Sequence, residues 1–205
     1  MILKICGITN QEDAAAAIDA GANAVGFNFY ARSPRYLAPE AAAEIVTAPG
    51  VRRVGVFVNE SRRRMGEIAR LARLDAAQLH GDETPADYPE AALPVWKALR
   101  VAADFRLALY RDLPVEALLL DGPAGELYGG AGRMFDWTLA RETGAPLGPR
   151  IVLAGGLDAS NVAAAIQRAR PWGVDACSRI EIAPGRKDRQ KMSEFLQRAM
   201  AAASQ

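Results

Sequence analysis

A cysteine near the N-terminus and an aspartate in mid-chain are the residues best suited to proton transfer. Cys6 ends the apolar run Ile2–Cys6, and Asp121 ends the run Ala117–Asp121. A thiol and a carboxyl group can divide the roles of general base and general acid when a substrate lies between them. Unperturbed, such groups titrate at about 8.5 and about 3.9, so their surroundings must adjust both for work near neutral pH. Taken alone, Cys6 is better explained as a small buried apolar residue, and Asp121 equally well as a loop cap.

Glycine pairs and a polar loop suggest that an anion is bound as well. Gly130 and Gly132 lie in one glycine-rich segment, and Gly155 and Gly156 lie in another. Backbone N–H groups at such glycines can approach a phosphate closely, although either segment alone could be an ordinary turn. Candidate substrate-binding groups also follow the last apolar run, namely Ser178 and Arg179.

Two further side chains have the chemistry of substrate binding. Arg35 follows Pro34 on a stiffened loop, where a guanidinium could bind a planar carboxylate through two hydrogen bonds, although a solvated arginine is equally compatible. His80 is the only histidine. The sequence shows no partner for it, which favours a structural or substrate-positioning role over proton transfer.

Eight short apolar runs separate these groups along the chain. Their nearly continuous apolar character is typical of parallel strands that are covered on both faces. The predicted strands are Ile2–Cys6, Ala24–Phe29, Arg53–Val58, Ala76–His80, Val95–Leu99, Ala117–Asp121, Ile151–Ala154 and Val174–Cys177.

Helical signals occupy the gaps between the predicted strands. The segment that starts at Thr9 has capping-box spacing and ends at Gly21, and Asp158 is placed to cap a helix over Asn161–Ala169. A weaker signal covers Ala102–Leu109. The last helix would bury one face, formed by Met192, Phe195, Leu196 and Ala199.

This alternation predicts the α/β class and a single-domain (β/α)8 TIM barrel over residues 1–205, with an open doubly wound sheet as the alternative. Periodicity alone contains no signal for closure of the sheet. In a barrel, chemistry lies at the carboxyl ends of the strands. The candidate residues would therefore face one opening.

Composition excludes several classes of protein. The chain has 205 residues, 25 basic and 24 acidic, which gives a formal charge of +1 and no positive excess to bind nucleic acid or an anionic membrane. The charge runs Arg62–Arg64 and Arg186–Arg189 are interpreted as solvated helix starts. The two cysteines lie in no CxxC pair, which argues against a zinc site or a disulfide framework. With no leader or long apolar stretch in the sequence, we expect a cytoplasmic protein.

Seven segments in order along nearly the whole chain resemble the phosphoribosylanthranilate isomerase family. They are Lys4–Thr9, Gly26–Phe27 with Ser33–Arg35, Val54–Asn59, Gln78–Glu83, Gly129–Gly132 with Phe135–Trp137, Leu153–Leu157 with Asn161–Val162, and Pro184–Asp188. Any one of these segments is a weak signal, whereas seven in order are highly specific.

The resemblance implies a cofactor-free barrel enzyme without a metal, acting on the phosphosugar N-(5-phosphoribosyl)anthranilate by an Amadori rearrangement, the third step from chorismate to tryptophan. It implies that Asp121 is the general acid at the ribose ring oxygen and that Cys6 is the general base at C2. Arg35 would bind the anthranilate carboxylate. The phosphate would lie on the backbone of Gly130–Gly132, Gly155–Gly156 and Ser178.

Two positions depart from the family pattern. Arg179 stands where the family usually has glycine, and Ala131 stands where it usually has threonine. Arg179 could supply positive charge to the phosphate instead. Two alternatives stay open: another phosphosugar barrel enzyme that uses paired carboxylates or a metal, and a noncatalytic phosphoribosyl-ligand binding protein. The sequence leaves monomer and homodimer equally open.

Overall fold

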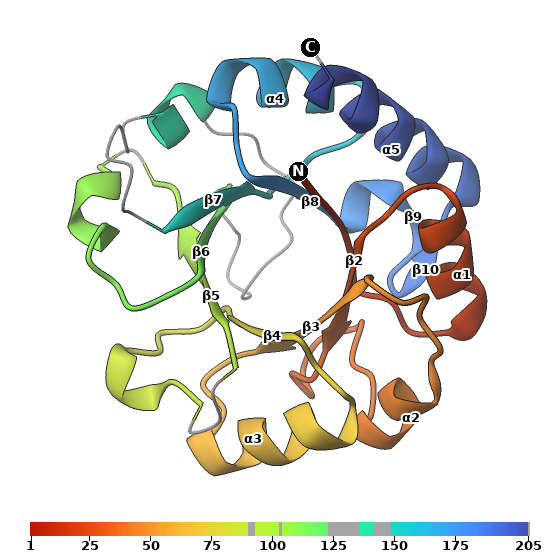
Figure 1. Ribbon diagram of the computed structural model, residues 1–205, viewed down its shortest axis with the longest axis vertical. Helices are drawn as coiled ribbons and strands as arrows, with labels where there is room; N and C mark the ends of the chain where they lie inside the picture. The colour runs from red at the N-terminus through yellow and green to blue at the C-terminus, as the bar shows by residue number, and fades with distance from the viewer. Residues whose placement is uncertain (90–92, 103, 123–135, 142–148, 205) are drawn as a thin grey trace.

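Eight parallel strands close into a barrel in the computed structural model, which describes residues 1–89, 93–102, 104–122, 136–141 and 149–204 (Figure 1). Each strand pairs with its neighbour in sequence, and β1 pairs with β8 to complete the ring. This confirms the predicted barrel and excludes the open sheet. The strands are β1 (Ile2–Cys6), β2 (Ala24–Asn28), β3 (Arg52–Phe57), β4 (Ala76–Leu79), β5 (Val95–Arg100), β6 (Ala117–Asp121), β7 (Arg150–Leu153) and β8 (Gly173–Ala176).

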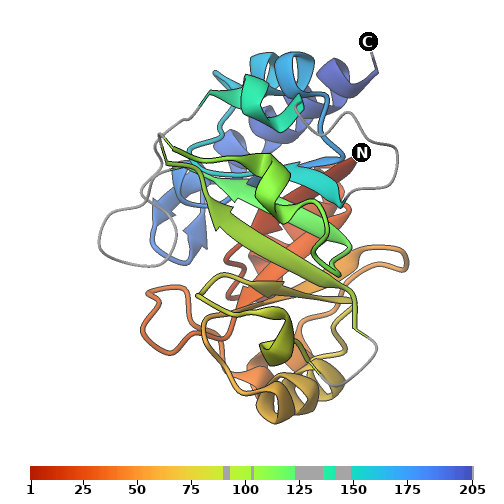
Figure 2. The ribbon, with the colours of Figure 1, turned by 90° about the vertical axis from the view of Figure 1, so that its left-hand side faces the viewer.

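Helices surround the barrel, as the views in Figure 1 and Figure 2 show. The α-helices are α1 (Gln11–Asp19), α2 (Pro39–Glu44), α3 (Arg62–Leu71), α4 (Val162–Ala169) and α5 (Arg189–Ala203). Single 3-10 turns stand in other gaps, as η1 (Pro85–Asp87), η2 (Leu107–Tyr110), η3 (Trp137–Arg141) and η4 (Ser178–Ile180). The prediction of a helix over Ala102–Leu109 was therefore wrong, because the described residues of this stretch form only the short η2 turn.

Apolar side chains fill both the space between strands and helices and the lower part of the barrel interior. Met192, Phe195, Leu196 and Ala199 of α5 are fully buried, as their spacing predicted. Inside the barrel, Trp96 packs edge-on against Trp172, and small side chains surround the pair. This apolar layer separates polar groups at the amino ends of the strands, such as Arg52 and Glu116, from those that face the pocket at the carboxyl ends.

A buried arginine ties two helices to the barrel. Arg53 of β3 is 6% exposed and donates hydrogen bonds to the carbonyl oxygens of Ala42, Ile45 and Ala72, which lie at the ends of α2 and α3. The side chain thereby satisfies acceptors that a helix C-terminus leaves open. The bonds also fix the spacing between two helices and the third strand.

The helix caps differ from the predicted ones by one or more residues. Asn10 rather than Thr9 caps α1, accepting the N–H of Asp13, while the Thr9 hydroxyl donates to the carbonyl of Gly185. Asp158 does not cap α4. Its carboxylate accepts from Ser160 and Arg179 instead, so the chain makes an extra turn before α4 begins.

A short antiparallel hairpin follows the eighth strand, made of β9 (Glu181–Ala183) and β10 (Arg186–Lys187). The turn contains Gly185 with a φ of +80°, a conformation that glycine adopts without strain. The hairpin corrects the interpretation of Arg186–Arg189 as a solvated run, because Lys187 is only 4% exposed and points inward. Arg62–Arg64 are exposed, as predicted.

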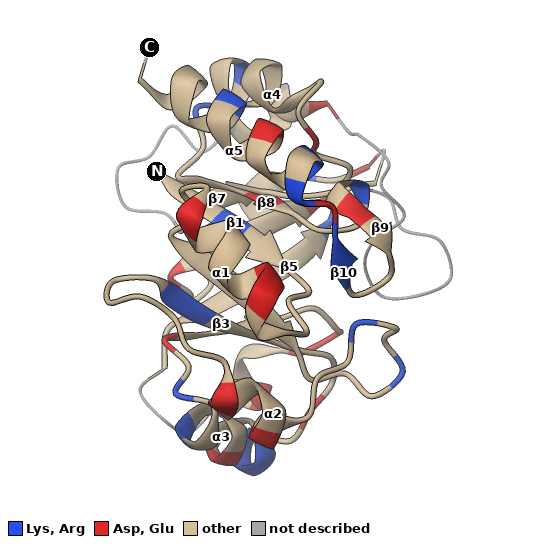
Figure 3. Cartoon of the chain, turned by 90° about the vertical axis from the view of Figure 1, so that its right-hand side faces the viewer, with Lys and Arg blue, Asp and Glu red and all other residues tan. Residues whose placement is uncertain are grey.

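In Figure 3, α1 and α2 carry only acidic residues, whereas both signs of charge occur on α5 and on α3. Arg63 and Arg64 pair with Glu67 on that helix. With four arginines and one glutamate, α3 is a basic helix in a chain whose formal charge is +1. In the part of the chain that the structure describes, no helix is both long and apolar enough to cross a membrane.

Candidate active site

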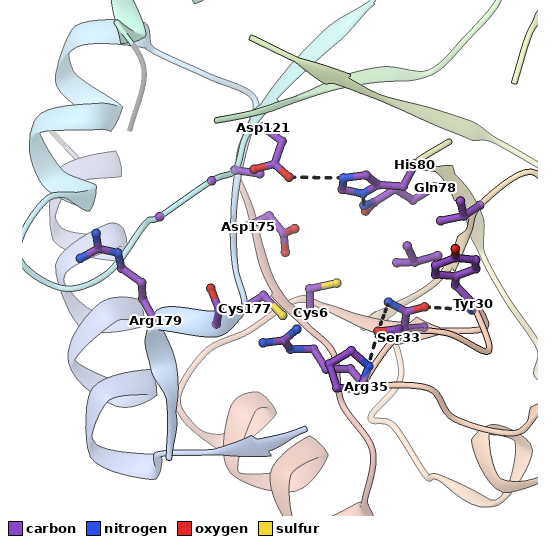
Figure 4. Close-up of a pocket in the computed structure, with 18 of the residues that line it drawn as sticks. Cys6, Tyr30, Ser33, Arg35, Gln78, His80, Asp121, Asp175, Cys177 and Arg179 are labelled. Carbon is purple, nitrogen blue, oxygen red and sulfur yellow. Dashed lines mark hydrogen bonds and ion pairs between the residues drawn. The ribbon is translucent and has the colours of Figure 1, made fainter. Parts of the chain in front are cut away.

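A pocket of about 280 Å³ opens at the carboxyl ends of the strands (Figure 4). Successive strand residues point to opposite faces, so every second residue of each strand faces the barrel interior. Cys6, Asp121, Asp175 and Cys177 reach the pocket in this way from β1, β6, β8 and the residue after β8. His80 reaches it from the residue after β4. The structure therefore brings the two proposed proton-transfer residues to one cavity.

Cys6 is surrounded by hydrogen-bond donors and positive charge. The pKa of its thiol lies well below the usual value because the Cys177 thiol donates a hydrogen bond to it and because Lys4 and Lys187 lie nearby. Burial opposes this shift without reversing it. The same hydrogen bond raises the pKa of Cys177. Of the two thiols, Cys6 is thus the one that ionises first.

Asp121 is 6% exposed and faces the His80 ring, whose Nε2 lies 3.3 Å from Asp121 Oδ2 (Figure 4). The other ring nitrogen, Nδ1, lies 3.0 Å from Gln78 Nε2. With the amide nitrogen of Gln78 as donor, Nδ1 is the acceptor, and the Nε2 edge of the ring faces Asp121. His80 therefore has the partner that the sequence did not reveal.

Gly155 packs directly against the carboxylate of Asp121. A Cβ atom at Gly155 would lie 2.2 Å from the backbone nitrogen of Gly122 and 2.6 Å from Asp121 Oδ1. The residue also has a φ of +74°, in the left-handed region. Only glycine meets both conditions. The loop after β7 thus forms a wall against which Asp121 is positioned.

The predicted anion-binding residues fall into two sets. Gly155, Gly156, Ser178 and Arg179 line the same pocket. Arg179 lies 3.0 Å from the Asp158 carboxylate, an ion pair that holds the guanidinium near the loop after β7. Gly130 and Gly132 lie outside the described residues, as does Ala131.

Arg35 lines the pocket and is held by a carboxylate of the hairpin. Its Nε and Nη2 donate three hydrogen bonds to the two oxygens of Glu181, at 2.7 to 3.1 Å. Lys187 binds Glu181 as well, at 2.8 Å. These bonds leave Nη1 without a hydrogen bond to any residue that the structure describes. The Arg35 guanidinium is therefore held in one orientation and still has donors for a ligand.

The sequence analysis did not identify three residues that lie beside the candidate site residues, namely Gln78, Asp175 and Glu181. Glu181 is 146 residues from Arg35 in sequence. Gln78 and Asp175 are polar residues inside otherwise apolar strands, and both are buried. A buried polar residue in a strand of a barrel is itself a signal, because such groups rarely face inward unless they bind something.

Comparison with known proteins assigns the family. The model of a family described as N-(5'phosphoribosyl)anthranilate (PRA) isomerase matches residues 3–198. The chain belongs to this family. A PRA isomerase of Solibacter usitatus (strain Ellin6076) is 66% identical over 202 residues, which cover 98% of both chains.

Solved PRA isomerases share the fold. The chain is 38% identical to the enzyme of Thermotoga maritima, solved as mutually generated monomers of a dimeric protein, with a TM-score of 0.83 and coverage of 98% of this chain and 100% of that one. The same identity and coverage hold for a PRA isomerase in complex with reduced 1-(o-carboxyphenylamino)-1-deoxyribulose 5-phosphate, with a TM-score of 0.84.

Proposed function

We propose that this member of the PRA isomerase family performs its reaction with Cys6 as general base and Asp121 as general acid. The enzyme is an isomerase of tryptophan biosynthesis that rearranges N-(5'-phosphoribosyl)anthranilate to 1-(2-carboxyphenylamino)-1-deoxyribulose 5-phosphate without gain or loss of atoms. The observation that supports these roles best is the meeting of both side chains in one pocket, from strands that are three apart in the closed ring of eight.

The first step of the proposed mechanism opens the sugar ring. Protonated Asp121 gives its proton to the ribose ring oxygen, the bond between that oxygen and C1 breaks, and the anthranilate nitrogen donates its lone pair to form a Schiff base. The carboxylate that remains faces the Nε2–H of His80 at 3.3 Å. This N–H stabilises the negative charge that develops on Asp121.

The second step removes the proton at C2. The Cys6 thiolate takes this proton, the C–H electron pair forms a double bond between C1 and C2, and the Schiff-base electrons return to nitrogen. The resulting enolamine tautomerises to the aminoketone product. The lowered pKa of Cys6 favours the thiolate form that this step requires. Both proton transfers use side chains, so the proposal requires no cofactor.

The remaining predicted residues would bind the two ends of the substrate. Arg35 is oriented by Glu181, and its Nη1 is available for the anthranilate carboxylate. Gly155, Gly156 and Ser178 would hold the phosphate through backbone N–H groups, with Arg179 adding positive charge. Gly130 and Gly132 complete this site in the proposal.

His80 has a second part in binding. Its Nε2 has no well-aligned hydrogen bond to a described residue, although Asp121 lies close. Because Gln78 holds the ring, the Nε2 edge stays between Asp121 and the pocket, where it can also bind a sugar hydroxyl. We further propose that residues 1–205 act as one barrel domain in the cytoplasm, as a monomer or a homodimer.

A continuous fluorescence assay tests the proposed roles. The substrate is made from anthranilate and phosphoribosyl pyrophosphate with a purified phosphoribosyltransferase, and its fluorescence is followed after the protein is added. Cys6→Ala and Asp121→Asn should each reduce kcat by about 10²–10⁴-fold with little change in KM. Lys191→Met on the exposed face of α5 is the control. Turnover close to the wild-type rate in either variant would remove that residue from its role.

A further inference from the structure

We propose that Lys4, held in place by Asp175, is a positioning residue that keeps Cys6 ionised for its role as the base. The inference rests on the proposed function of Cys6 and adds a pair of residues that take no part in the two proton transfers described above. In this proposal neither Lys4 nor Asp175 donates a proton to the substrate or accepts one from it. Their effect is exerted on the thiol.

Lys4 lies inside the barrel beneath the pocket. It stands two residues before Cys6 on β1, which places both side chains on the inner face of that strand. The Lys4 side chain is 0% exposed, and its ammonium group lies 3.0 Å from Asp175 Oδ1. Asp175 is the residue directly opposite Lys4 in the pairing of β1 with β8. The ammonium is thus confined to the space between the two strands.

A gap in the neighbouring strand lets the ammonium approach the thiol. Gly26 of β2 is the pairing partner of Cys6 and has no side chain. A Cβ atom at Gly26 would lie 2.8 Å from Cys6 Sγ and 3.0 Å from Lys4 Nζ. The sulfur and the ammonium therefore converge on the same point, and a larger residue at that position would separate them.

The buried pair is hard to explain by stability alone. Removing two charges from water costs about as much as their attraction returns, and apolar pairs of similar volume often fit such places equally well. The strands around the pair are otherwise filled by apolar side chains such as Val54 and Leu119. The buried Lys4–Asp175 pair is explained if its cation stabilises the Cys6 thiolate.

The charge states of Lys4 and Asp175 favour the Cys6 thiolate. Although burial by itself would lower it, the pKa of Lys4 is raised because Asp175 and ionised Cys6 lie close, so Lys4 stays protonated. Burial raises the pKa of Asp175 to about 7, which reduces the negative charge that opposes the thiolate. Other titratable or charged groups also act on Cys6 or Asp175. They are Cys177 after β8, Lys187 of β10, Arg35 in the loop after β2 and Asp121 of β6.

The test reads the thiol itself in the absence of substrate. Cys177→Ser leaves Cys6 as the only cysteine of the chain and keeps a hydroxyl donor at position 177. In this background, the ultraviolet absorbance of the thiolate and the rate of alkylation by iodoacetamide are followed against pH. Lys4→Met should raise the thiol pKa by at least about one unit, so the pH at which half of the thiol is ionised moves up by the same amount. Lys191→Met on α5 is the matched control. An unchanged titration in folded Lys4→Met would overturn the proposal.

Two further variants keep the test decisive. If Lys4→Met alone does not fold, Lys4→Met/Asp175→Leu removes both charges and should show the same raised thiol pKa. Asp175→Asn keeps an oxygen acceptor for Lys4 and removes negative charge, so the thiol pKa should stay low or fall further. A rise in Asp175→Asn, or no rise in the double variant, would contradict an electrostatic role.

The outcome is separable from that of the proposed function. The thiol titration needs no turnover, so an unshifted pKa in Lys4→Met defeats the inference even if Cys6 is the base. Conversely, wild-type turnover by Cys6→Ala defeats the function of Cys6 while the effect of Lys4 on the thiol could persist. When both hold, Lys4→Met should also shift the acidic limb of kcat/KM upward in pH with KM nearly unchanged.

Discussion

Glu181 is the residue whose replacement separates orientation of the substrate from proton transfer. Its carboxylate accepts three hydrogen bonds from Arg35 and one from Lys187. The side chain is only 4% exposed, and that of Lys187 is fully buried. Glu181→Gln keeps the shape of the side chain and one acceptor oxygen but removes the charge that both cations face.

The expected size of the effect follows from these contacts. A hydrogen bond to a charged group contributes about 1.5–3 kcal/mol, and breaking a buried pair costs about 3–5 kcal/mol. Because the amide of Gln keeps part of the bonding and Arg35 is partly exposed, we expect a loss of about 2–3 kcal/mol in unfolding free energy. Arg35 would also lose its fixed orientation. A loss of about 1.4 kcal/mol in substrate binding raises KM about tenfold.

Urea unfolding and steady-state kinetics measure the two effects in parallel. With a slope of about 2–3 kcal/mol per M, the urea midpoint should fall by about 1 M. The fluorescence assay should show the rise in KM with kcat within about threefold of the wild type, since Cys6 and Asp121 are untouched. A KM equal to that of the wild type would refute the claim that Glu181 orients Arg35 for the substrate. A large fall in kcat at unchanged KM would show that the hairpin acts on the chemistry instead.

Other parts of the site give three further predictions. Gly155→Ala should reduce both kcat and stability, because the new Cβ would collide with Gly122 and Asp121 and the left-handed backbone costs an alanine about 1–2 kcal/mol. Gly50 has a φ of +85° and open space around it, so the control variant Gly50→Ala should lose stability but keep kcat. Arg179→Ala should raise both KM and the inhibition constant of inorganic phosphate several-fold at unchanged kcat, whereas equal inhibition constants would place Arg179 outside the phosphate site. The pKa of Glu181 is lowered, since the bonds from Arg35 and Lys187 outweigh the effect of burial. The Glu181 carboxylate therefore stabilises the fold above the usual pKa of 4.5, and this stabilisation is lost as the pH falls through the lowered pKa of the folded protein. The urea midpoints of the wild type and Glu181→Gln should thus converge in acid, and a constant difference between them would contradict this.

The strands were predictable because parallel strands in a barrel are buried on both faces. The bounds of β1 and β6 agree with the predicted ones to the residue. Those of β2, β4 and β5 differ by one residue at the C-terminal end, and those of β3, β7 and β8 differ by one residue at both ends. Continuous apolar runs produce this agreement. Closure of the sheet was not predictable in the same way, because it depends on the pairing of β1 with β8, which no local pattern encodes.

The site was predictable only in its individual residues. Cys6, Arg35 and Asp121 have side chains whose chemistry is evident in isolation, and their position after a strand indicates a shared opening. Their partners come from distant parts of the chain, as with Glu181 beside Arg35 and Lys4 beside Asp175. Helix caps were missed for a related reason. Asp158 has the chemistry of a cap, but Arg179, 21 residues away, competes for its carboxylate.

A deuterium isotope effect at C2 tests the division of roles between Cys6 and Asp121 most directly. Single-turnover rates would be measured with C2-deuterated and ordinary substrate in Cys6→Ser and in Asp121→Asn. If Cys6 takes the C2 proton and Asp121 opens the ring, slowing the Cys6 step should give the full isotope effect, and slowing the Asp121 step should nearly abolish it. An isotope effect that is equal in the two variants, or larger in Asp121→Asn, would contradict the assignment of base and acid.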